Sequence, residues 1–147
     1  MENFKINFQV VGVIVVICLA IWAILSTNNP KISGIENSLK KEYSCIQQLP
    51  YSTLINLESS HKSDRALVDA QFKTDKNFDE IKKFYDGQLS KLDWVNENEQ
   101  SIKDWNRDLG GYIIHYTKGE YSLDIQYAGN MANYGWTYSI AISWGYN

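Results

Sequence analysis

The 147-residue sequence is poor in the residues that mark several classes of protein. It has two cysteines, two histidines and two prolines. Two cysteines cannot build a dense disulfide scaffold or a four-thiolate zinc site. Nine glycines and 44% hydrophobic residues exclude a collagen-like or a disordered chain. The length suits one ordinary domain.

Runs of basic residues are also missing. The chain carries 14 Lys+Arg against 17 Asp+Glu, which gives a formal net charge of −3. A nucleic-acid-binding surface needs clustered basic side chains to neutralise phosphates. We therefore expect no nucleic-acid partner.

Catalytic and cofactor motifs are absent too. No paired His or Cys spacing, nucleophile elbow, phosphate loop or dinucleotide fingerprint occurs. We consider one pair of potential metal ligands, His61 with Asp64. The acidic residues of 93–108 are interpreted as a solvated loop or as a surface for a cation or a basic partner. We predict no catalytic residue, no cofactor and no metal site, and hence no enzyme.

One long apolar run lies near the start of the chain. No charged residue occurs between Lys5 and Lys31, and within 10–25 the thiol of Cys18 is the one polar side chain. With residues 8 and 9 the run would form a helix of ~27 Å, close to the thickness of a bilayer core. We predict that it spans the membrane through Val10, Gly12, Ile14, Ile17, Ile21 and Leu25.

The predicted span has the features of an uncleaved signal anchor, residues 1–29. Possible cleavage sites place bulky Ile21 or Ile24 where a signal peptidase needs a small residue. Residues 30–48 form an amphipathic connector, with apolar residues at helical spacing: Ile32, Ile35, Leu39 and Tyr43. The connector packs on the domain or membrane, or else binds a partner. Cys45 is either a buried thiol or an intermolecular link.

Residues 49–147 are expected to form an α+β domain. The periodicity predicts a helix over 77–92 that begins at Asp75 or Asn77, and Gly87 suggests close packing against its backbone. Clean alternation predicts an antiparallel sheet with one buried face, covered by that one main helix. The expected strands cover residues 51–57, 66–73, 101–105, 112–117, 120–127 and 136–144, with a turn at 108–111.

One group of residues carries a family resemblance. Thr74 ends a strand, the helix contains Phe84, Tyr85 and Leu89, and Trp94 follows it. With the opening Leu49-Pro50-Tyr51, this resembles small bacterial membrane-anchored envelope proteins and lipoproteins, mostly of unassigned function. The chain departs from that pattern at Asp93, where Gly is usual, and at Ser52-Thr53, where Pro-Gly would follow.

The resemblance implies a domain outside the cytoplasmic membrane and transfers no catalytic residue. The positive-inside rule, applied to Lys31, Lys40 and Lys41, slightly favours a cytoplasmic domain. We give the resemblance more weight than this rule.

Tryptophan and tyrosine are abundant, with five and ten residues. We expect some of them to contact a partner, namely Trp105 in a 94–108 loop, Tyr134 and Trp136. The first hypothesis is therefore a single-pass accessory or assembly subunit of a membrane complex, with the bilayer and a protein as partners. The alternative is a small-ligand-binding or enzymatic domain with a cleft near 129–136, lined by His115 and carboxylates. In a third reading, the Gly12 face packs into a larger membrane complex.

Overall fold

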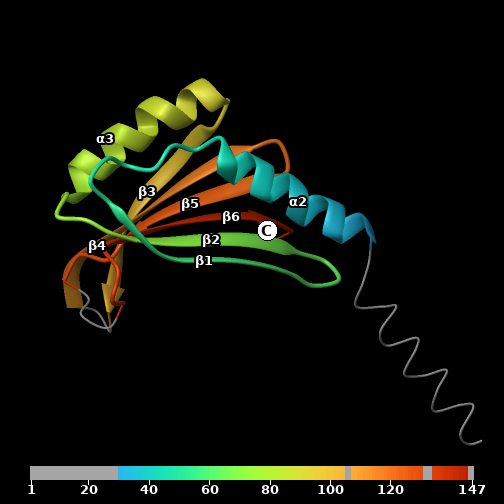
Figure 1. Ribbon diagram of the computed structural model, residues 1–147. Helices are drawn as coiled ribbons and strands as arrows, with labels where there is room; N and C mark the ends of the chain where they lie inside the picture. Colours follow the sequence, from blue (N-terminus) through green and yellow to red (C-terminus); the bar gives the residue numbers. More distant parts are fainter. Residues whose placement is uncertain (1–29, 105–106, 131–133, 146–147) are drawn as a thin grey trace, which may run out of the picture.

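Strands of alternating polarity build one antiparallel sheet in the computed structural model, which describes residues 30–104, 107–130 and 134–145. The sheet has six strands in the order β1-β2-β6-β5-β4-β3 (Figure 1). Their bounds are β1 Thr53–His61, β2 Ala66–Lys73, β3 Val95–Asp104, β4 Arg107–Lys118, β5 Tyr121–Tyr127 and β6 Tyr138–Trp144. The predicted α+β class and antiparallel sheet are confirmed.

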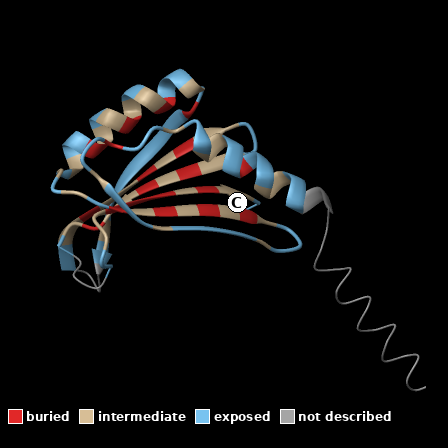
Figure 2. Cartoon of the chain, in the orientation of Figure 1, coloured by how far each residue is buried: buried red, intermediate tan, exposed pale blue. Residues whose placement is uncertain are grey.

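One face of the sheet is buried, as the alternation predicted. In β2 the side chains of Ala66, Val68, Ala70 and Phe72 are buried, while the residues between them are partly exposed (Figure 2). Phe72 stacks on Tyr138 of β6 with ring centroids 4.8 Å apart. Successive strands continue this apolar layer because directly opposed residues share a face. It includes Ile114, Leu123, Ile125, Ile140 and Ile142.

Two helices cover that face, α2 (Pro30–Ser44) and α3 (Phe78–Leu89), and α3 continues into a short 3-10 turn, Ser90–Leu92 (Figure 1). α3 buries Ile81, Tyr85 and Leu89. The prediction of one main covering helix was incomplete, because α2 packs on β1, β2 and β6. Its Leu39 is fully buried, so the segment predicted as a connector contributes to the core.

The expected strand at 101–105 overlaps the end of β3, but the prediction of a loop over the rest of 94–108 was wrong. β3 and β4 form an antiparallel hairpin there, and residues 108–111 lie within β4 rather than in a turn. β3 is an edge strand. The side chains of residues 95–101 are exposed, and that of Ile102 is half-buried. An edge strand that faces water on most sides needs no apolar alternation, so its polar sequence resembles that of a loop.

The predicted membrane-spanning segment and its six positions lie outside the described residues. Among the residues that the structure does describe, no helix combines the length and the apolar character needed to cross a bilayer.

A polar cluster fastens α2 to β1. Glu36 of α2 accepts a hydrogen bond from Ser59 at 2.8 Å, forms an ion pair with Lys40 at 2.7 Å and contacts Nδ1 of His61. Of the His61–Asp64 pair considered as a metal site, His61 contacts Glu36 and Asp64 pairs with Arg65. No group of three metal-ligating side chains occurs in the described ranges.

This cluster predicts a loss of stability in acid. Hydrogen bonds from Lys40, Ser59 and His61 lower the pKa of Glu36 from 4.5 to about 2. Because the folded-state pKa is the lower one, the stabilisation is complete above pH 4.5 and disappears as the pH falls toward 2. Glu36→Gln should lower the free energy of unfolding at pH 7 by about 1–2 kcal/mol and flatten its dependence between pH 4.5 and 2. Urea titrations across this pH range test it, and an unchanged pH profile in the variant would contradict it.

Candidate functional site

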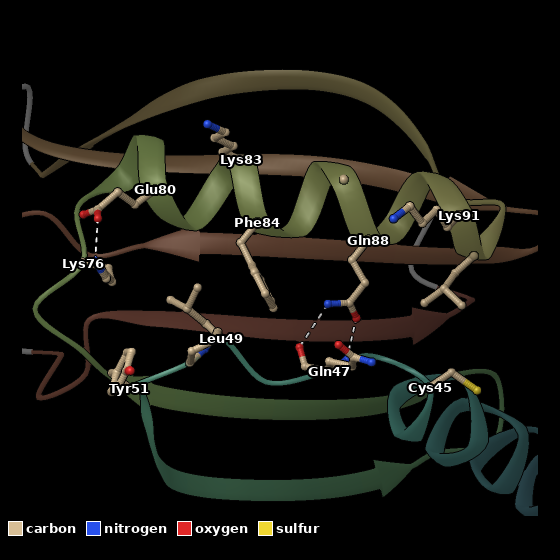
Figure 3. A pocket seen from close by; sticks show the side chains of 13 residues that line it. Cys45, Gln47, Leu49, Tyr51, Lys76, Glu80, Lys83, Phe84, Gln88 and Lys91 are labelled. Carbon is tan, nitrogen blue, oxygen red and sulfur yellow. Dashed lines mark hydrogen bonds and ion pairs between the residues drawn. The ribbon is translucent and has the colours of Figure 1, made fainter.

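A groove runs between α3 and the segment that joins α2 to β1. Its volume is about 820 Å³, and Cys45 and Tyr51 lie among the residues that line it. Phe84 and Gln88 point from α3 toward the 45–51 segment (Figure 3). Leu49, Phe84 and Leu92 give the groove an apolar lining. A concave surface of this size is large enough to hold several side chains of a ligand.

Buried hydrogen bonds hold the 45–51 segment in place beside α3. The Leu49 amide donates to the Tyr85 hydroxyl at 3.2 Å, and that hydroxyl lies 3.0 Å from the hydroxyl of Tyr138. Tyr138 in turn donates to Ser52 at 3.2 Å. Burial raises the pKa of the Tyr85 and Tyr138 phenols, so both remain protonated at neutral pH and the network persists. These hydrogen bonds attach the wall of the groove to both α3 and β6.

A second pair of hydrogen bonds closes one part of the groove. The side-chain oxygen Oε1 of Gln88 accepts a hydrogen bond from the backbone amide of Gln47 (Figure 3). The side-chain nitrogen Nε2 of Gln88 donates to the backbone carbonyl of Gln47 at 3.3 Å. A side chain that satisfies both backbone groups of one residue substitutes for a strand neighbour. Gln88 thus links helix α3 directly to the joining segment.

The groove carries unbalanced positive charge. Lys76 pairs with Glu80 at 2.7 Å, and that contact raises the pKa of Lys76 and lowers that of Glu80. Lys83 and Lys91 also line the groove, and neither forms an ion pair with any described residue. The two lysines leave the groove with a net charge of about +2, since Lys76 and Glu80 cancel.

The surroundings of Gly87 and Cys45 differ from those predicted. A Cβ added to Gly87 would meet nothing within 4 Å, so the prediction of close packing there was wrong. Gly87 instead lines the open groove. Cys45 is exposed, which excludes its reading as a buried thiol. Both residues lie where the surface is hollow because the joining segment stands away from the helix.

The residues that carried the family resemblance have structural roles. Thr74 accepts from the Lys76 amide at 3.3 Å ahead of the α3 capping box, in which Asn77 and Glu80 bond each other's backbone amides. Of the two candidate caps, Asn77 is thus confirmed. Tyr85, Leu89 and Trp94 are buried. All three belong to the apolar core between the helices and the sheet.

Asp93 occupies the position where the resembling proteins carry glycine. Its φ is +64°, a left-handed conformation, and the next amide, that of Trp94, donates to Leu89 at 3.0 Å. This conformation costs a residue with a Cβ free energy that glycine avoids. Asp93→Gly should raise the free energy of unfolding by about 0.5–1 kcal/mol. Denaturant titration measures the change, and Asp93→Val should act in the opposite direction; a destabilised glycine variant would contradict the argument.

The predicted partner-contact residues are only partly described. Tyr134 and Trp136 stack with ring centroids 4.7 Å apart, and Tyr134 is exposed. They precede β6, near the end of the sheet where Phe78 stacks on Tyr112 at 4.3 Å. Trp105 lies outside the described residues. The role of these three aromatic residues in partner contact stays a prediction.

His115 is not part of the groove. It lies in β4, where Nδ1 is 2.6 Å from Asp124 and Nε2 is 2.9 Å from the Gln100 amide. Both ring nitrogens thus contact neighbouring side chains of the sheet. The described residues of the 129–136 segment, 129–130 and 134–136, are not among those that line the groove. The cleft expected near that segment is therefore not the groove found here.

The lysines of the groove were missed at the level of sequence. α3 and the 3-10 turn that follows it carry a second stripe at three-to-four-residue spacing, formed by Glu80, Phe84, Gly87 and Lys91. That stripe could have indicated a second contact surface. This stripe becomes one wall of a groove only because the 45–51 segment, which is distant in the sequence, lies beside it.

Comparison with protein-family models, with curated proteins and with solved structures found no match for the chain. The resemblance to membrane-anchored envelope proteins therefore stays a prediction.

Proposed function

We propose that the chain is a single-pass membrane protein whose α+β domain binds a protein partner outside the cytoplasm, as an accessory or assembly subunit of an envelope complex. The observation that carries this proposal is the apolar groove with two lysines, Lys83 and Lys91, that form no ion pair within the described part of the chain. Residues 1–29 serve as the anchor, and the groove between α3 and the 45–51 segment receives the partner.

The lining of the groove favours binding over catalysis. Glu80 is the one carboxylate among the described residues that line it, and Lys76 and the Asn77 amide already engage its oxygens. General acid–base chemistry needs two titratable groups in reach of one substrate. Among the described residues that line the groove there is no histidine and no second carboxylate to complete such a pair, so we assign no reaction to it.

The partner's contact segment is expected to combine apolar side chains with carboxylates. Phe84 and Leu92 would pack against the apolar groups, while Lys83 and Lys91 would pair with the acidic ones. Charge complementarity of this kind selects partners and accelerates association. It does not suit a basic ligand, which the two lysines would repel.

The test is purification of the full-length protein in a mild detergent, with mass spectrometry of the proteins that accompany it. A stoichiometric partner is expected with the wild-type chain, and Lys83→Glu combined with Lys91→Glu should reduce its recovery at least tenfold. The matched control, Lys62→Glu with Lys103→Glu, makes the same charge change at two exposed lysines outside the groove. A wild-type chain that purifies alone, or equal losses in both variants, would overturn the proposal.

A further inference from the structure

Exposed apolar side chains gather at the start of β1 and just before it. Six large hydrophobic side chains are exposed in the described ranges, and four of them lie within residues 51–57. They are Tyr51 at 94% exposure, Leu54 at 41%, Ile55 at 49% and Leu57 at 49%. Figure 2 shows β1 exposed along most of its length. Such a patch on a soluble domain marks a contact with another molecule.

Among the strands that the structure describes, none pairs with the outer side of β1. β1 pairs with β2 and stands at the end of the strand order, so its outer backbone groups are free to pair with a further strand. The opposite edge, β3, is protected differently. It carries Glu97, Glu99 and Lys103, and charged side chains on an edge discourage strand addition. Residues 53–57 of β1 have no charge at all.

We propose that β1 of one chain pairs antiparallel with β1 of a second copy, joining two sheets into one. The pairing is self-complementary because an irregularity between Leu54 and Asn56 places both Leu54 and Leu57 on the buried face, opposite Phe72 and Ala70 of β2. In a two-fold contact Leu54 of each copy then opposes Leu57 of the other.

The remaining pairs of this register are compatible with the contact. Thr53 opposes Glu58 of the other copy, so no like charges face each other. A slip by one residue would place Leu54 against a residue of the polar face, which makes the register specific. Pairing with an unrelated strand would not require β1 to match its own sequence in reverse. Because Leu54 and Leu57 do match in this way, a second copy is the favoured occupant.

The geometry also suits two chains held in one membrane. The two-fold axis of an antiparallel strand pair stands perpendicular to the sheet, so the α2 helices of both copies lie on the same face of the joined sheet. Anchoring, which belongs to the proposed function, would raise the effective concentration and allow a short strand contact to suffice. The pairing itself depends on β1 alone.

Directed cross-linking of the full-length chain in mild detergent tests the register. In a background of Cys18→Ser and Cys45→Ser, a copy with Leu54→Cys is co-expressed with a differently tagged copy with Leu57→Cys. Opposed residues have Cα atoms about 5 Å apart, within disulfide range, whereas the two Leu54 positions would lie about 10 Å apart. We expect at least tenfold more disulfide in the mixed pair than between two Leu54→Cys copies. Equal yields would overturn the proposal.

Native mass spectrometry gives an independent measurement. The wild-type chain should be a dimer, and Leu57→Lys should convert it to a monomer. Val95→Lys, a matched change at an exposed apolar residue of the other edge strand, should leave the dimer intact. A monomeric wild-type chain, including one whose β1 is covered by a different protein, would overturn the inference. The groove variant Lys83→Glu/Lys91→Glu should remain dimeric, so failure of the groove proposal and failure of β1 pairing are distinguishable.

Discussion

Replacement of Leu39 by alanine is expected to lower the free energy of unfolding by about 2–5 kcal/mol. Leu39 is fully buried and belongs to the same apolar core as the sheet, whereas its neighbours Ile35 and Tyr43 are only partly buried. Removing its side chain would leave a cavity under α2 that the polar contacts of Glu36 cannot fill. The loss should therefore concentrate in the docking of α2.

Denaturant titration of the full-length chain in mild detergent measures the total loss, and hydrogen exchange locates it. Amides of α2 should lose protection more than those of β5. Asn37→Ala is the matched control, since Asn37 is exposed on the same helix and its truncation should change the free energy of unfolding by less than about 0.5 kcal/mol. A loss below about 1 kcal/mol for Leu39→Ala would show that α2 does not depend on this contact.

The second large effect is expected at Gly129, which follows β5. Its φ is +59°, and an added Cβ would lie 2.5 Å from the carbonyl carbon and oxygen of Gly110. The next residue, Asn130, donates to the Leu109 carbonyl at 2.8 Å and holds the two segments together. Because the obstruction is backbone, it cannot move aside as a flexible side chain would. Gly129→Ala should cost about 3 kcal/mol or more.

Gly135→Ala separates the clash from the backbone conformation. Gly135 has φ +69°, yet an added Cβ there would meet nothing within 4 Å. Its replacement should therefore cost about 1–2 kcal/mol, the penalty of the left-handed conformation alone. Thermal or denaturant unfolding of both variants measures the difference, and equal losses would refute the close approach at Gly129.

Some elements could be predicted from residue pattern because their pattern follows local geometry. β2, β5 and β6 alternate in sequence between large apolar and smaller or polar residues, since one face of each contacts the core. α3 has both a capping box and an apolar stripe, and its start at Asn77 follows from them. These signals are short-range, so neighbouring residues are enough to reveal them.

The candidate site could be predicted only in part. Phe84 and Tyr85 were singled out with the helix, but Lys83, Lys91 and Gln88 acquire meaning only beside the 45–51 segment. That segment lies about 40 residues away in the sequence, and it is held by Tyr85 and Gln88. Contacts at such separation leave no periodic trace, because each partner has the pattern of its own element.

Local chemistry alone determined the class of the fold, the alternation of its inner strands, the start of α3 and the apolar character of residues 10–25. The tertiary structure decided which strands lie at the edges, and thereby why polar β3 is a strand and why apolar residues 51–57 are exposed. It also decided that α2 joins the core through Leu39 and that a groove opens beside α3. The physical reason is that burial is a property of the whole assembly: a side chain is covered or left exposed by elements that its own neighbours in sequence do not specify.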